Sequence, residues 1–108
     1  MVEYAVLWTE TARRDLEAIV DYIAEDSLEN ALSVLDRLET RACALTTTPQ
    51  RGRKVPELRT LDLHQYQELI ENPWRIIDRI EQGRVLVVAV LDGRRDLQSL
   101  LIDRLVRS

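Results

Sequence analysis

The residues best suited to chemistry in this chain are its arginines. Fourteen of the fifteen basic residues are arginine, and Lys54 is the only lysine. A guanidinium is a planar fork that binds a carboxylate or a phosphate through two parallel hydrogen bonds, so this bias suits directed contacts to anions. A GC-rich coding sequence would produce the same bias without a functional reason.

The arginines gather at three places in the sequence. Arg75 and Arg79 are four residues apart, so a strand would place both on one face with Ile77 between them. Arg94 and Arg95 follow an apolar segment in a predicted turn, and residues 50–58 form a loop that is the most basic stretch of the chain. Each group could bind a partner's anions or pair with acids of this chain.

Residues for proton transfer or metal binding are few. Tyr66 and His64 could move protons in principle, but no residue is evident that would orient His64, which is expected at the surface. A single histidine and a single cysteine, Cys43, do not supply the four ligands of a structural zinc site, so we expect neither a metal nor a cofactor. Cys43 is expected to be a small buried hydrophobic residue.

Length and composition favour one globular domain spanning residues 1–108. The chain is 45% hydrophobic and 31% charged, which is typical of a folded protein. No apolar run approaches the roughly 20 residues that span a bilayer, and no signal-peptide pattern is present. We therefore expect a cytoplasmic protein with no membrane partner.

The net charge of −4 is unevenly distributed. Residues 1–39 carry a net charge of −7, and residues 40–108 carry +3. Strong general binding to nucleic acid requires clustered positive charge, so an acidic chain is not expected to do it. Local binding through the C-terminal two-thirds stays open.

The N-terminal half predicts a strand and two helices. Residues 4–8 read as a strand, and Thr9 is suited to cap a helix that ends near Ala24. Asp26 or Ser27 can cap a second helix, whose apolar residues form one stripe. The stripe, which we expect in the core, contains Leu28, Ala31, Leu32, Leu35, Leu38, Ala42 and Leu45. The short linker predicts an antiparallel helical hairpin.

The C-terminal half changes to a period of two. Strands are predicted over 65–70, 74–80 and 85–91, with a hairpin turn at 81–84, and Asp96 is suited to cap a last helix. The apolar side of that helix is Leu97, Leu100, Leu101 and Leu105. The order β-α-α-β-β-β plus a short helix predicts an α+β fold, an antiparallel sheet of about four strands packed on the N-terminal hairpin.

The segment 85–91 requires cover on both of its faces. Its seven apolar residues do not alternate with polar ones, which is typical of a central strand. The helical hairpin covers only one face of a sheet. We expect an apolar groove on the other face, open to a partner, unless the last helix and residues 46–64 close it.

Seven segments together resemble one protein family. They are residues 8–19, 21–24, 49–53, 56–58, 66–70, 73–80 and 93–96. In this order they resemble the RelE/ParE-type toxins of bacterial toxin–antitoxin pairs, over nearly the whole chain. The resemblance implies one of two activities: RelE-like members are ribosome-dependent endoribonucleases that cut mRNA, whereas ParE-like members inhibit DNA gyrase. Both are neutralised by an antitoxin whose C-terminal segment wraps the toxin.

The ParE-like branch is favoured. If the chain were RelE-like, Arg75, Arg94 and Arg95 would be its catalytic residues by resemblance. However, no tyrosine follows the Gly93–Asp96 segment, and Asp78 stands where both branches commonly have tyrosine, placing a carboxylate near any bound phosphate. A net negative charge also suits poorly a protein that must enter the ribosome. A third possibility is an inactive module that only binds an antitoxin.

The resemblance also suggests binding residues. Candidates for target contact are Arg51, Arg53, Lys54, Arg94, Arg95 and Arg104. Candidates for contact with a ParD-like antitoxin are Trp74, Arg75, Ile77, Arg79, Leu86 and Val88. The expected antitoxin combines an apolar helix or strand with an acidic segment. The expected assembly is a toxin–antitoxin hetero-oligomer, with DNA gyrase as the target.

Overall fold

The computed structural model describes residues 3–107 of the chain, with the side chains of residues 105–107 outside that description. In chain order the elements are β1 (Ala5–Trp8), α1 (Glu10–Ala24), α2 (Leu28–Cys43), a short 3-10 turn (Ala44–Thr46), β2 (Arg53–Lys54), α3 (Pro56–Arg59), β3 (Tyr66–Glu71), β4 (Trp74–Glu81), β5 (Arg84–Asp92) and α4 (Leu97–Arg107). The predicted helices and strands are all present. The basic loop additionally contains β2 and α3, which the sequence did not predict.

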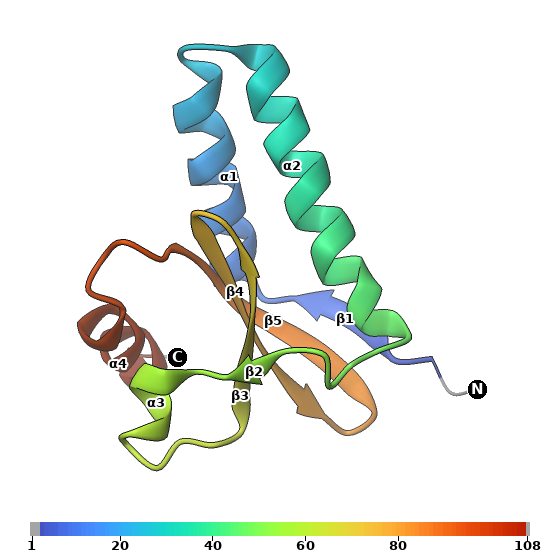
Figure 1. Cartoon of the computed structure of the whole chain (residues 1–108), viewed down its shortest axis with the longest axis vertical. Helices are drawn as coiled ribbons and strands as arrows, with labels where there is room; N and C mark the ends of the chain where they lie inside the picture. The colour runs from blue at the N-terminus through green and yellow to red at the C-terminus, as the bar shows by residue number, and fades with distance from the viewer. Residues whose placement is uncertain (1–2, 108) are drawn as a thin grey trace.

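The two N-terminal helices begin at the predicted caps. The Thr9 side chain accepts a hydrogen bond from the backbone N–H of Ala12 at 3.2 Å, and Ser27 does the same for Asn30 at 3.1 Å. These bonds satisfy backbone donors that the first helical turn leaves free. The helices α1 and α2 lie side by side as an antiparallel hairpin that rises beyond the sheet (Figure 1).

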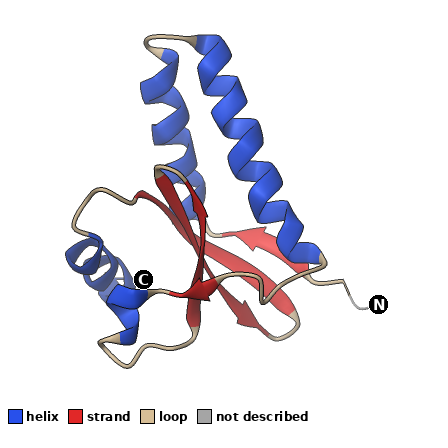
Figure 2. Cartoon of the chain, in the orientation of Figure 1, coloured by secondary structure: helices blue, strands red, loops and turns tan. Residues whose placement is uncertain are grey.

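The sheet contains five strands in the order β1-β5-β4-β3-β2. Figure 2 shows the strands gathered together below the two long helices. The three long strands form the predicted antiparallel hairpins. The sheet is nevertheless mixed, because β1 pairs in parallel with β5, from Ala5 beside Arg84 to Trp8 beside Val87. The sequence had suggested about four antiparallel strands. β1 and β5 are separated in the chain by α1, α2 and the strands β2, β3 and β4, so they meet through packing of distant segments.

The chain reverses direction between β4 and β5 in a tight turn, at the position that the sequence predicted. Gln82 and Gly83 both have positive φ angles, of 51° and 77°. Two successive residues of this kind form the tight turn whose twist matches that of paired strands. Further along the same pair, Ile77 lies beside Ala89 and Asp78 beside Val87, so Val88 is an extra residue that bulges from β5.

Apolar side chains cover both faces of the sheet. We call the face that packs on α1 and α2 the inner face; its cluster includes Leu16, Leu38, Ile76 and Val87. We call the opposite face, which packs on α3 and α4, the outer face. Its cluster is Val55, Leu58, Tyr66, Ile77, Ala89, Leu91, Leu97 and Leu101. β5 contributes to both clusters, which confirms the prediction for residues 85–91.

Two predictions for α2 are wrong. Leu28 and Leu32 were expected in the core, but they are 65% and 55% exposed, and Val34 is buried instead. The hairpin extends beyond the sheet, so its distal turns have no layer to pack against. Cys43 is likewise exposed rather than buried, because it faces away from the inner-face cluster near the end of α2.

Candidate functional site

Arg75 on β4 is the most highly bonded arginine of the outer face. Its Nη1 and Nη2 donate to the two carboxylate oxygens of Glu57 on α3, both at 2.7 Å, and its Nε donates to Glu68 Oε1 on β3 at 2.6 Å. Arg75 is 9% exposed and Glu68 is 1% exposed. The guanidinium therefore has a carboxylate on each side, which lowers the pKa of Glu57 and raises that of Arg75, chiefly through the hydrogen bonds between them.

Arg75 lines a cleft together with two further arginines, Arg53 and Arg94. The cleft has a volume of about 560 Å³ and is also lined by residues of the β3–β4 turn. Arg53 Nε donates to Glu68 Oε2 at 2.7 Å. Arg94 donates to both carboxylate oxygens of Asp92, and this pairing holds the pKa of Asp92 at about 2.

The structure thus brings together Arg53, Arg75 and Arg94 but pairs each with a carboxylate of the chain. Arg75 was a candidate for contact with a phosphate or an acidic partner, and pairing with acids of this chain was the other possibility. It pairs with two acids of this chain, because the short helix α3 brings Glu57 across the outer face. A sequence signal for a buried pair existed in Glu68, which shares one face of its strand with Tyr66 and Ile70. A carboxylate in such a position requires a cation when it is buried.

The other candidate target contacts do not join this cleft. Lys54 donates to the backbone oxygen of His64, and with Gln67 it lines a separate cleft. Arg51 lines a third hollow in the loop before β2. Arg104 on α4 donates to Asp15 Oδ2 on α1 at 2.5 Å. Arg95 is exposed in the turn before α4, beside Arg94.

The candidate antitoxin contacts divide between the two faces. Trp74 packs against the inner-face cluster, whereas Ile77 belongs to the outer-face cluster and is fully buried. Leu86 and Val88 are half-buried. Arg79 contacts Tyr66 on the outer face, so Arg75, Ile77 and Arg79 share that face as predicted.

The outer face is not the wide open groove that we expected. Leu97 and Leu101 of α4 are buried against Ile77, Ala89 and Leu91, and α3 closes the region around Tyr66. Two polar contacts keep α4 in this position: Asp96 caps its first turn through the N–H of Ser99 at 3.3 Å, and Arg104 reaches Asp15. The alternative in which the chain's own C-terminal segments close the core is correct for this part of the sheet. Leu105, also expected on the apolar side of α4, has its side chain outside the described residues.

Asp78 is fully buried and lies away from the arginines. It alternates along β4 with Ile77 and Arg79, so its side chain points to the inner face. Gln67 donates to its Oδ1 at 2.7 Å, and Oδ2 has no hydrogen-bond partner among the described residues. Burial raises its pKa to about 7. The expectation that Asp78 sits beside a phosphate site is wrong.

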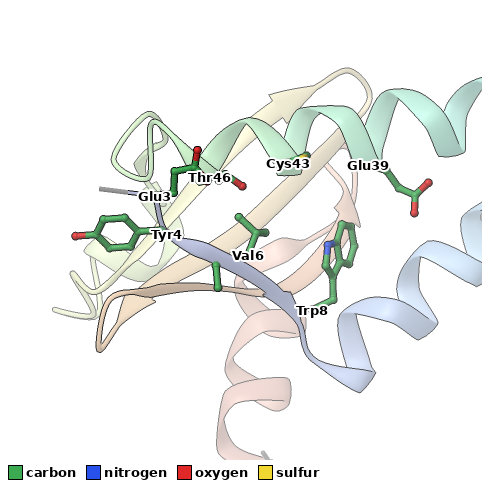
Figure 3. A pocket seen from close by; sticks show the side chains of 8 residues that line it. Glu3, Tyr4, Val6, Trp8, Glu39, Cys43 and Thr46 are labelled. Atoms are coloured by element: carbon green, nitrogen blue, oxygen red, sulfur yellow. The ribbon is translucent and has the colours of Figure 1, made fainter. Parts of the chain in front are cut away.

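A groove that the sequence did not predict lies between α2 and β1. It has a volume of about 560 Å³, and Figure 3 shows Tyr4, Val6 and Trp8 of the β1 segment opposite Glu39 and Cys43 of α2. β1 is an edge strand, paired on one side only. The Tyr4 N–H donates to the Thr46 oxygen at 2.8 Å and fixes one end of the groove. Its walls come from elements far apart in the sequence, so residue spacing alone gave no signal.

No metal or membrane-spanning feature is evident within residues 3–107. No group of three or more His, Cys, Asp or Glu side chains is placed there to hold a metal ion. Within the same residues, every helix is too short or too polar to cross a lipid bilayer.

Comparison with known proteins identifies the family. The family model described as ParE toxin of type II toxin-antitoxin system, parDE, matches residues 6–97. No curated protein matches the sequence. The chain is similar in structure to a chain of the chromosomal ParDE toxin–antitoxin system from P. aeruginosa, with a TM-score of 0.66 and 21% identity over 83% of this chain and 96% of that one.

The chain is also similar to a second solved structure. It is the toxin–antitoxin complex RelBE2 from Mycobacterium tuberculosis, with a TM-score of 0.61 and 25% identity over 85% of this chain and 93% of that one. The structural similarity covers most of this chain and most of each neighbour. Since the family model covers most of the chain, and the fold agrees with it, the chain belongs to the ParE toxin family and is a toxin of a type II toxin–antitoxin system.

Proposed function

We propose that this chain is a ParE-like toxin that inhibits DNA gyrase without being an enzyme itself. It acts in the cytoplasm, where it docks on gyrase and stabilises the cleaved DNA complex so that strand breaks persist. A ParD-like antitoxin neutralises it by forming a toxin–antitoxin hetero-oligomer. The family match and the two neighbouring toxin–antitoxin structures support the antitoxin partner.

The observation that favours gyrase inhibition over RNA cleavage is the pairing of Arg75 with two carboxylates. An endoribonuclease must aim a cation at the scissile phosphate and must place groups that take and give a proton. Arg75 stands where RelE-like toxins are expected to have that cation, but Glu57 and Glu68 occupy its donors. Two carboxylates beside the guanidinium would also repel a phosphate.

Tyr66 and His64, which could transfer protons in principle, are also not positioned for RNA cleavage. Tyr66 is 5% exposed, and its hydroxyl accepts a hydrogen bond from Arg79. His64 lies in an exposed loop with its Nε2 2.6 Å from Asp62 Oδ1. Neither side chain lines the cleft that contains Arg53, Arg75 and Arg94. Arg75 and Arg94 therefore share a cleft that neither of these two proton-transfer candidates lines, which supports a function without RNA cleavage.

Overall charge supports the same choice. The chain carries a net charge of −4, and its strongly acidic segment, residues 1–39, contains the whole α1 helix and most of α2. Approach to the ribosome, a dense polyanion, is favoured by positive charge on the incoming protein. A protein target does not impose that requirement.

A supercoiling assay with purified gyrase tests the proposal. Added toxin is expected to reduce supercoiling and to leave cleaved DNA that persists until the protein is removed. The double variant Arg94→Ala, Arg95→Ala removes two exposed candidate contacts and is expected to inhibit more weakly. The matched control is Arg13→Ala, Arg14→Ala, which removes two exposed arginines from α1. Unchanged supercoiling at a large excess of wild-type toxin would rule out gyrase as the target.

Translation of a reporter mRNA provides the decisive counter-test. In this assay ribosomes, mRNA and the purified toxin are combined, and the mRNA is examined for cuts in codon register. We expect no toxin-dependent cuts. Cuts that appear with wild-type toxin and disappear with Arg75→Ala would instead establish the RelE-like activity and contradict the argument from the paired arginine. A chain that affects neither assay but binds an antitoxin would be the inactive module.

A further inference from the structure

The cover over the outer face is incomplete at the β1 edge. Val6 and Trp8 of β1 pack against the inner-face cluster, so Leu7 between them points to the outer face, where it is 43% exposed. Leu86 lies beside Leu7 in the parallel pair, and it is half-buried like Val88 further along β5. We call Leu7, Leu86 and Val88 the apolar strip. α3 and α4 leave these three side chains partly accessible.

A small cavity opens beside the apolar strip. It has a volume of about 110 Å³ and lies between β4, β5, α4 and the start of α1. Val88, Ala89 and Leu101 form apolar walls, and Arg79 and Arg104 contribute the positive charge. The volume is sufficient for the end of one acidic side chain, since a water molecule occupies about 30 Å³ in the liquid.

Arg79 differs from Arg75 in making no hydrogen bond to a carboxylate among the described residues, although Glu81 lies beside it as an ion pair. Its Nη1 donates to the Tyr66 hydroxyl at 3.3 Å, and its guanidinium carbon lies 6.0 Å from the centre of the Tyr66 ring. Its Nη2 is 3.3 Å from Glu81 Oε2, but that oxygen makes no hydrogen bond among the described residues. Its Nε is buried and is also without a hydrogen-bond partner there.

A buried donor without a partner is costly, and an incoming acceptor would remove that cost. The contrast with the neighbouring arginines is direct. Arg75 has two carboxylates and Arg94 has one, each with oxygens within 3.0 Å of a guanidinium nitrogen. Of the two arginines of β4 that were candidate antitoxin contacts, Arg79 is therefore the one whose guanidinium donors are less fully occupied.

We propose that the neutralising partner binds this surface through one acidic side chain, which enters the cavity and accepts hydrogen bonds from Arg79, while flanking apolar side chains pack on the apolar strip. The inference rests on the proposed neutralisation by an antitoxin and names the chemistry of the segment that does it. A carboxylate on a polypeptide fits better than a nucleic-acid phosphate because the cavity walls are apolar and the chain is acidic overall.

Peptide binding measured by NMR tests the proposal on the isolated toxin. The probes are acetyl-Leu-Val-Glu-Val-Leu-amide and its glutamine counterpart, and the reporter is the Nε–Hε signal of Arg79. The glutamate peptide is expected to shift this signal in a saturable manner. Because hydrogen bonds to charged groups are stronger than neutral ones, it should bind at least roughly tenfold more tightly than the glutamine peptide.

Variants separate the roles of charge and packing. Arg79→Met removes the donors and keeps an apolar stem, so the advantage of the glutamate peptide should disappear. Val88→Glu places a carboxylate of the chain itself next to the cavity and should block the peptide while Arg79 is retained. The matched control is Arg84→Met, which removes an exposed arginine of β5 and should leave binding unchanged. The backbone NMR spectrum of each variant establishes that it remains folded.

Three outcomes would overturn the inference. These are an unshifted Arg79 signal at the highest soluble peptide concentration, equal binding of the two peptides, and equal binding by Arg79→Met and wild type. Inorganic phosphate serves as a further arm, and a shift as tight as that of the glutamate peptide would contradict the assignment to a polypeptide carboxylate. Gyrase is absent from this experiment, so its failure leaves gyrase inhibition standing, and a toxin that fails to inhibit gyrase can still bind the peptide.

Discussion

Arg75 and Glu57 form a two-point ion pair, with Nη1 to Oε2 and Nη2 to Oε1 both at 2.7 Å. The pair joins β4 to the four-residue helix α3, which is too short to be stable by itself. Leu58 of the same helix is fully buried in the outer-face cluster. The ion pair therefore serves both to occupy the arginine and to hold α3 over the sheet.

The first prediction concerns the stability that this pair provides. Glu57→Gln leaves Arg75 with Glu68 alone and weakens the attachment of α3, so the free energy of unfolding should fall by about 2 kcal/mol. Urea denaturation measures the change. The control is Glu10→Gln, which breaks the exposed pair with Arg14 on α1 and should cost less than about 0.5 kcal/mol. Equal losses in the two variants would show that the Glu57 pair contributes no more than a surface contact.

The sequence predicted the elements of the fold well where local signals are strong. Thr9, Ser27 and Asp96 marked three helix starts, and the change to a period of two located β3, β4 and β5. Both signals arise from neighbouring residues, so they are readable without tertiary contacts. The parallel pairing of β1 with β5 depends on how distant segments dock, and residue spacing carries no information about it.

The candidate site was less predictable for the same reason. The sequence placed Arg75 and Arg79 on one face correctly, but their different surroundings depend on Glu57, on Glu68 and on the position of α4. Arg104 contacts Asp15 across 89 positions of the sequence. Such a contact is decided by packing of the whole chain, as is the docking of Leu97 and Leu101 that covers much of the outer face.

The second prediction concerns the pH dependence of stability caused by Asp78. Burial raises the pKa of this carboxyl in the folded chain from 3.8 to about 7, so the folded state binds its proton more tightly than the unfolded state. The favourable contribution of the protonated Asp78 to the free energy of unfolding is fully present below pH 4. It is lost as the pH rises through 7. Asp78→Asn keeps an acceptor for Gln67 and cannot ionise, so it should be more stable than wild type at pH 8, by up to roughly 4 kcal/mol.

Urea denaturation at pH 4 and pH 8 measures this effect. The two proteins should differ little at pH 4, where Asp78 is protonated. Asp36→Asn on the exposed side of α2 is the control and should change the free energy of unfolding by less than about 0.5 kcal/mol at both values. A difference between Asp78→Asn and wild type that is the same at pH 4 and pH 8 would contradict a buried, titrating carboxyl.

The third prediction concerns the reactivity of Cys43. Its side chain is exposed in the groove between α2 and β1, so a thiol reagent such as dithionitrobenzoate should modify the native protein at a rate of the same order as the urea-unfolded protein. Cys43→Ser should leave the free energy of unfolding nearly unchanged, since no buried volume is lost. A native rate that is orders of magnitude slower would place the thiol in the core, as its position beside the apolar stripe of α2 had suggested.

The last prediction concerns the attachment of α4 to the outer face. Asp15 Oδ2 accepts from both the Val90 N–H at 3.0 Å and Arg104 at 2.5 Å, so one carboxylate connects α1, β5 and α4. Arg104→Met removes the contact to α4 and leaves the one to β5. Because the pair is only partly buried, the variant should lose about 1 kcal/mol of stability.

The local effect of that variant should exceed the global one. Hydrogen exchange of the α4 amides should become faster in Arg104→Met, while the amides of β4 and β5 keep their protection, since the helix can detach without unfolding the sheet. Arg13→Met, an exposed change on α1, is the control and should leave α4 exchange unchanged. If α4 exchanges at the same rate in all three proteins, then Leu97 and Leu101 hold the helix alone, and the ion pair with Asp15 does not decide how much of the outer face is covered.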